Sequence, residues 1–100
     1  MSHAVDDLPA IHPGEFLREE LAALGLSARK FADNIQVAHN AVTAIMNGER
    51  SITAPMAIRL GKAFGTTAQY WLNLQTIYDL KRARAEIPET TLNQIHTYTA

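Results

Sequence analysis

The sequence of 100 residues contains no cysteine. This absence excludes a disulfide framework, a thiolate zinc site and a cysteine nucleophile, and it fits a reducing compartment. No apolar run approaches the roughly 18 residues that a membrane span requires. The opening "MSHAVDDLPA" also lacks the basic start and the apolar stretch of a signal peptide. We therefore expect a cytoplasmic protein with no membrane partner.

Residue patterns typical of catalysis or metal binding are missing as well. No two histidines are spaced i, i+4 as in a helical metal site; the four are His3, His12, His39 and His96. The carboxylates that cluster fall in the first turns of a predicted helix, where they complement the helix dipole. They are Glu15, Glu19 and Glu20. We predict no enzyme activity, no catalytic residue, no metal and no cofactor.

The chain has little net charge, −1 in total, but the charge is unevenly distributed. Residues 1–26 carry −4, residues 27–65 carry +3 and the remainder is neutral. The low total argues against a protein that coats nucleic acid by bulk electrostatics. The local excess of positive charge suits phosphate contacts, although an unevenly charged solvated surface explains it equally well.

Apolar residues recur at helical spacing and predict an all-α fold, with five helices between residue 13 and about residue 86. Pro13 suits the first turn of the first helix and Gly25 its left-handed stop. The expected buried stripe of this helix is Phe16, Leu17, Leu21 and Leu24. We assign residues 12–86 to one domain, residues 1–11 to an N-terminal arm and residues 87–100 to a tail that we expect to fray.

The next two predicted helices are unusually short. Ser27 is placed to cap the first of them, and Asn34 is placed to end it in the left-handed conformation. The turn "NIQV" leads to the second, which Gly48 ends. The residues of this second helix expected to face inward are Ala38, Ala41, Val42, Ile45 and Met46.

Two longer helices follow. Thr53 is the predicted N-cap of the fourth helix, and Thr66 with Gln69 is consistent with a capping box at the start of the fifth. The apolar face of the fifth helix is expected to carry Trp71, Leu74, Tyr78 and Leu80.

Two short helices joined by a tight turn are the elements of a helix-turn-helix, here over about residues 27–47 with a recognition helix over about 38–47. The outward face of that second helix carries short uncharged side chains, where a solvated helix more often carries Glu, Lys or Arg. Short side chains of this kind can read base edges in the major groove. The candidate base-reading residues are His39, Asn40, Thr43 and Ala44.

Positive charge at the start of the preceding helix opposes the helix dipole, which indicates a bound phosphate held by free N–H groups, a hydroxyl and two cations. Two solvated side chains on a marginal helix remain the alternative explanation. The candidate phosphate-contacting residues are Ser27, Arg29, Lys30, Asn47 and Arg50.

Three stretches in order resemble one family. They are "HPGE" from His12, "NGERSITAPMAIRL" from Asn47 and "GTTAQYWLNLQTIYDL" from Gly65. Over residues 12–86 the chain is similar to the HigA antitoxins, also described as plasmid-maintenance antidote proteins, of the Cro/C1 helix-turn-helix superfamily. The resemblance implies a compact five-helix domain of the lambda-repressor type. It also implies a homodimer that binds double-stranded operator DNA, represses its own operon and neutralises a HigB-type ribonuclease toxin.

The sequence departs from the usual family pattern at three positions. Ala38 stands where Ser or Thr commonly caps the recognition helix, Ala41 where a polar or basic residue is frequent, and Glu49 where Lys is usual. Two alternatives stay open: a regulator without a toxin partner, and a toxin-binding module that has lost DNA binding, the second of which these three departures suggest. The expected protein-partner surface is the apolar area left uncovered near the tail, for instance Leu92, Ile95 and Tyr98.

Overall fold

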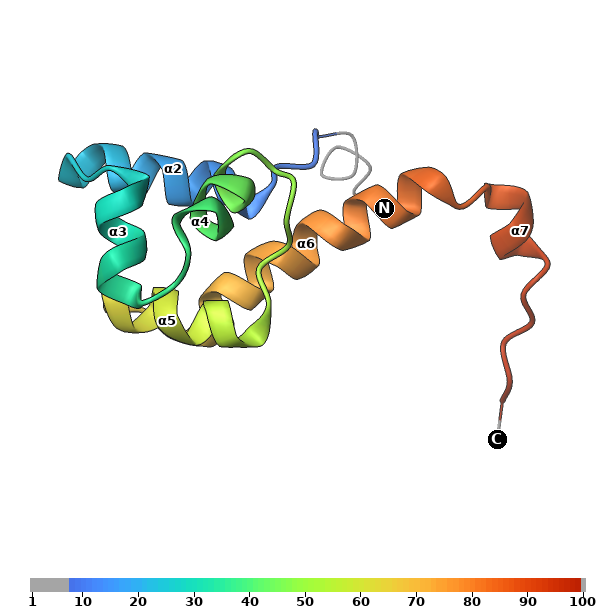
Figure 1. The fold of residues 1–100 in the computed structure, drawn as a ribbon. Helices are drawn as coiled ribbons and strands as arrows, with labels where there is room; N and C mark the ends of the chain where they lie inside the picture. Colours follow the sequence, from blue (N-terminus) through green and yellow to red (C-terminus); the bar gives the residue numbers. More distant parts are fainter. Residues whose placement is uncertain (1–7, 100) are drawn as a thin grey trace.

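A computed structural model describes residues 8–99, which form six helices and no strand (Figure 1). The helices are α2 (Pro13–Leu24), α3 (Ala28–Ile35), α4 (His39–Met46), α5 (Ala54–Phe64), α6 (Ala68–Glu86) and α7 (Glu89–Asn93). The predicted all-α fold is confirmed. Residues 1–7 of the predicted arm, with His3, and the last residue of the tail, Ala100, lie outside the described residues.

Several predicted helix ends are confirmed. Pro13 is the first residue of α2, and Gly25 ends that helix with a φ of 67°. Ser27 caps α3, because its Oγ accepts a hydrogen bond from the Lys30 N–H at 3.1 Å. Thr53 occupies the N-cap position of α5, although its side chain makes no capping hydrogen bond.

Two predicted helix ends are wrong. Helix α3 does not end at Asn34; it continues to Ile35, and Gln36 adopts the left-handed conformation with a φ of 61°. Helix α6 is capped by Thr67, whose Oγ1 accepts from the Tyr70 N–H at 3.1 Å, and not by Thr66. The Thr66 hydroxyl has another role, because it accepts a hydrogen bond from the Trp71 indole N–H at 3.0 Å.

The helices α2 to α6 share one core. Aromatic rings join α3, α5 and α6, since Phe31 stacks on Phe64 at 5.2 Å between centroids and Phe64 lies 5.6 Å from Trp71. The buried core residues are Leu17, Leu21, Phe31, Ala32, Ile35, Val42, Ile45, Ile52, Ala57, Leu60 and Trp71.

Three residues predicted to face inward are exposed instead. Leu24 and Leu80 are 58% and 45% exposed, and Ala38 is exposed at the N-cap of α4. The exposure of Leu80 is explained by the length of α6, because the C-terminal part of this helix extends beyond the other helices (Figure 1). Beyond it, the tail that we expected to fray contains the short helix α7, in which no residue is buried. No helix within residues 8–99 combines the length and hydropathy needed to cross a bilayer.

Candidate nucleic-acid interface

Helices α3 and α4 pack against each other and form a helix-turn-helix (Figure 1). Ala41, Val42 and Ile45 bury the inner face of α4 in the core. Because α4 spans only two turns, burial of these three side chains fixes which side of the helix faces outward.

The four candidate base-reading residues differ in accessibility. His39 and Asn40 are exposed in the first turn of α4, whereas Thr43 and Ala44 are half-buried. The Thr43 hydroxyl is also engaged within its own helix, at 3.3 Å from the His39 carbonyl and 3.2 Å from the Asn40 carbonyl. His39 and Asn40 are therefore the two candidates with accessible side chains. They lie at the N-terminal end of α4, the end that would enter a DNA groove first.

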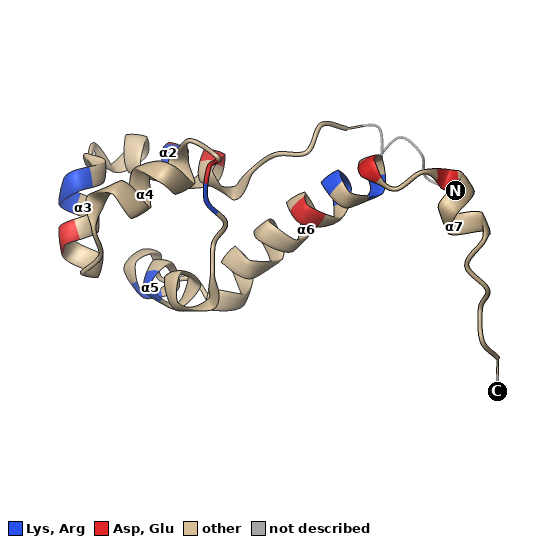
Figure 2. Ribbon diagram, turned by 45° about the vertical axis from the view of Figure 1, so that its right-hand side comes forward, with Lys and Arg blue, Asp and Glu red and all other residues tan. Residues whose placement is uncertain are grey.

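The candidate phosphate contacts gather at two places. Arg29 and Lys30 are exposed in the first turn of α3, and Figure 2 shows the start of that helix in blue, the colour of Lys and Arg. Ser27 lies directly before them, and its hydroxyl already accepts the Lys30 N–H. Arg50 is exposed in the loop that follows α4, beside the exposed Glu49. An acidic neighbour at this position offsets part of the positive charge that Arg50 offers to a phosphate.

Asn47, the remaining candidate phosphate contact, is tied to α2. One Arg18 Nη atom donates to the Asn47 Oδ1 at 3.0 Å and to the Met46 carbonyl at 3.1 Å. Arg18 thus places a cation on the last carbonyl of α4, that of Met46, where it also complements the helix dipole. Sequence reasoning missed this role. The available signal was that Arg18 is the one basic residue among the first 26.

The "HPGE" stretch, at the start of α2, packs against α4. The His12 Nδ1 accepts a hydrogen bond from the Gly14 N–H at 2.8 Å and so caps α2. Gly14 is buried, and a Cβ added there would lie 1.8 Å from the Ile45 carbonyl oxygen of α4. This close approach of two backbones requires glycine, so the stretch fixes the position of α4 relative to α2.

The surroundings of His12 favour its neutral form. Its imidazole packs edge-on against the Tyr78 ring at 4.9 Å between centroids, and partial burial lowers the pKa of His12 below the ordinary 6.5. A hydrogen bond with the Arg50 backbone and the charges of Asp79 and Glu15 oppose this shift but do not cancel it. Protonation would also remove the Nδ1 lone pair that caps α2.

Fold stability is expected to fall in mild acid because of His12. The folded-state pKa lies below 6.5, so between the two values the unfolded chain binds more protons than the folded protein. The stabilisation by His12 is complete above pH 6.5 and is lost as the pH falls through the lowered folded-state pKa. Urea unfolding at pH 7.5 and 5.0 measures this loss. His12→Asn keeps a capping acceptor without titrating and should lose less stability, whereas the exposed His39→Asn should follow wild type.

The sequence pattern of the helix-turn-helix family matches residues 17–71, the part of the chain that contains α3, the turn, α4 and α5. The chain belongs to the Cro/C1-type helix-turn-helix family. It therefore carries a helix-turn-helix DNA-binding domain, in which α3 and α4 are the two helices of the motif.

Among helix-turn-helix proteins, this chain is similar to HigA-family antidote proteins, as the resemblance predicted. It is 47% identical to an addiction module antidote protein of a HigA family from Coxiella burnetii, covering 91% of this chain and 100% of that one with a TM-score of 0.87. A structure of the Pseudomonas aeruginosa antitoxin HigA with the higBA promoter is 41% identical, covering 87% and 96% of the two chains with a TM-score of 0.82. Virulence-associated protein I of Dichelobacter nodosus is 49% identical over 82 residues, 81% of this chain and 76% of the relative.

Proposed function

We propose that this helix-turn-helix protein is the antitoxin of a HigBA-like toxin–antitoxin system, which binds operator DNA in its own promoter and represses the operon. The observation that carries the proposal is the first turn of α4, where His39 and Asn40 are exposed and uncharged, together with the exposed cations Arg29 and Lys30 at the start of the preceding helix, α3. Short polar groups can approach base edges closely, while the cations Arg29 and Lys30 are suited to phosphate contacts. The complex of the Pseudomonas aeruginosa relative with its promoter supports this role.

Operator binding is proposed to require a homodimer. A two-turn recognition helix such as α4 spans only a few base pairs, and helix-turn-helix repressors gain affinity by placing two such helices about 34–36 Å apart on one face of the duplex. The cognate operator is accordingly expected to contain two related half-sites.

The second partner is proposed to be a HigB-type ribonuclease toxin. Three apolar side chains in or beyond α7 are available to bind it, because Leu92, Ile95 and Tyr98 are 46%, 65% and 97% exposed. Coexpression of this chain with a small reading frame neighbouring its gene is the test. Restored growth supports toxin neutralisation, and a toxic product whose effect persists with folded antitoxin present contradicts it.

Replacing His39 and Asn40 together with alanine is expected to lower affinity for the upstream duplex by tenfold or more, since each base contact contributes about 1–3 kcal/mol. Both side chains are exposed and neither donates nor accepts a side-chain hydrogen bond within residues 8–99, so the fold should be unaffected. Fluorescence anisotropy at two salt concentrations is the measurement. The matched control replaces an Asn and a His of the tail, Asn93 and His96, which are also exposed and should leave DNA affinity unchanged.

The salt dependence separates base contacts from phosphate contacts. The double variant in α4 should keep the wild-type salt slope, whereas Lys30→Ala should reduce the slope by about 0.9, the value of one neutralised phosphate. Absence of specific binding by folded wild type would contradict autorepression. It would instead favour a protein-binding module, in line with the uncapped Ala38 and the acidic Glu49.

A further inference from the structure

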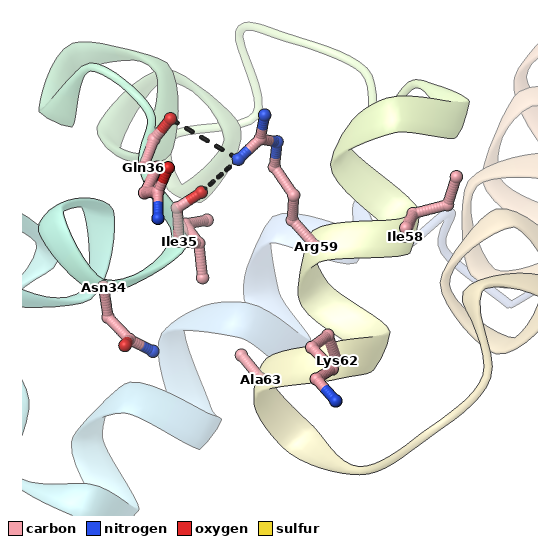
Figure 3. Close-up of a pocket in the computed structure, with 7 residues that line it drawn as sticks. All are labelled: Asn34, Ile35, Gln36, Ile58, Arg59, Lys62 and Ala63. Atoms are coloured by element: carbon pink, nitrogen blue, oxygen red, sulfur yellow. Dashed lines mark hydrogen bonds between the residues drawn. The ribbon is translucent and has the colours of Figure 1, made fainter.

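One arginine outside the helix-turn-helix reaches its turn. Arg59 lies in the middle of α5, and one of its Nη atoms donates to the Ile35 carbonyl and, at 3.4 Å, to the Gln36 carbonyl (Figure 3). These two oxygens lie at the C-terminal end of α3, where helical carbonyls have no partner within the helix. The contact therefore joins α5 to the segment that connects the two DNA-binding helices.

The turn holds a side-chain-bearing residue in an unfavourable backbone conformation, which an added tertiary contact can stabilise. Gln36 has a φ of 61°, the left-handed conformation that side-chain-bearing residues rarely adopt. The N-terminus of α4 also lacks a side-chain cap, because its N-cap residue, Ala38, cannot accept a hydrogen bond through its side chain. Two backbone bonds close the end of α3: the Gln36 N–H donates to the Asp33 carbonyl at 3.3 Å, and the Val37 N–H donates to the Ala32 carbonyl at 3.0 Å. The Arg59 guanidinium adds a charge-assisted pair of bonds at the negative end of the α3 dipole.

We infer that Arg59 is a positioning residue for base reading. It fixes the turn between α3 and α4, and thereby the place at which His39 and Asn40 leave the first turn of α4. The inference rests on the proposed operator binding for its functional consequence, but the hold on the turn is a property of the free protein. Arg59 acts through the Ile35 and Gln36 carbonyls and is not itself a DNA contact.

Lys62 provides a matched control. It lies on α5 in the same groove between α3 and α5 and carries the same charge, yet no hydrogen bond of its ammonium group occurs within residues 8–99 (Figure 3). Arg59→Met and Lys62→Met thus remove one positive charge each from the same surface, and only the first removes bonds to the turn.

The first measurement is amide hydrogen exchange in the free protein. Arg59→Met is expected to speed exchange at the Gln36 and Val37 amides about tenfold, as loss of a charge-assisted hydrogen bond implies, while amides of the buried α2 residues Leu17 and Leu21 keep their protection. Lys62→Met should leave all of these rates unchanged, and Arg59→Lys should restore part of the protection. Unchanged exchange in the turn of Arg59→Met would overturn the inference, whatever the protein binds.

The second measurement is the ratio of specific to non-specific DNA affinity over a salt series. Arg59→Met is expected to lower this ratio about tenfold with an unchanged salt slope, because misplaced base readers lose specificity while phosphate contacts remain. A reduced slope with an unchanged ratio would make Arg59 a phosphate contact and overturn the positioning role. If folded wild type bound no DNA, the proposed function would fail, and the exchange experiment would still decide whether Arg59 holds the turn.

Discussion

Replacing Gly14 with alanine is expected to destabilise the fold by about 3 kcal/mol or more, at the upper end of overpacking effects. The new Cβ would lie 1.8 Å from the Ile45 carbonyl oxygen and 2.8 Å from its carbon, and both are backbone atoms that cannot rotate away. Either α2 or α4 must move, so the variant should also lose operator affinity beyond what its folded fraction explains. Thermal unfolding and anisotropy on the same samples measure the two effects.

The sign of the stability change in Gly14→Ala tests the close approach of α2 and α4. Within a helix, Gly→Ala ordinarily stabilises by roughly 0.5–1 kcal/mol, so a neutral or stabilising result would contradict the close approach of α2 and α4. Gly25→Ala provides the control. A Cβ at Gly25 meets nothing within 4 Å, and only its φ of 67° opposes the substitution, at about 1–2 kcal/mol. Loss of DNA binding should therefore accompany Gly14→Ala and not Gly25→Ala.

Replacing Gln75 with methionine is expected to cost about 1–3 kcal/mol of stability, the penalty for leaving a buried N–H without a partner. Gln75 is 5% exposed on α6, and its Oε1 accepts from the Ile52 N–H at 2.7 Å. Its Nε2 donates to the Asp79 Oδ1 at 2.9 Å. Methionine has a similar volume but removes both bonds, so urea unfolding reports the loss of hydrogen bonding with little change in packing.

Gln69→Met is the control for this substitution on the same helix. Gln69 is exposed and donates to the Asn73 Oδ1 at 2.9 Å, a bond that water can replace. Its substitution should change stability by less than about 0.5 kcal/mol. Equal effects at positions 69 and 75 would contradict a structural role for the Gln75 amide. A larger effect at 75 would establish that α6 anchors the loop carrying Ile52, which follows the proposed recognition helix.

Helix ends were predicted correctly from the sequence where neighbouring residues alone determine the backbone conformation. Pro13, Gly25 and Ser27 act within one helical turn of their own positions, so their roles could be predicted. Gln36 could not be identified in this way, because glutamine carries no local preference for the left-handed conformation, and Arg59, which donates to its carbonyl, comes from another helix. Thr66 was misassigned for a different reason, since its hydroxyl accepts from the Trp71 indole five residues further along the chain, while Thr67 caps α6.

Periodicity and residue chemistry are enough to predict the helical class, the two short helices of the helix-turn-helix and the small polar face with its candidate residues His39 and Asn40. The contacts that hold that face come from the packing of the helices: Gly14 against the Ile45 carbonyl, Arg18 on Asn47, Arg59 on the turn and Gln75 on Ile52. Each of these contacts joins residues at least 23 positions apart. A periodic pattern shows that a polar side chain or a glycine is tolerated at such positions, but the partner is set by the packing of whole helices.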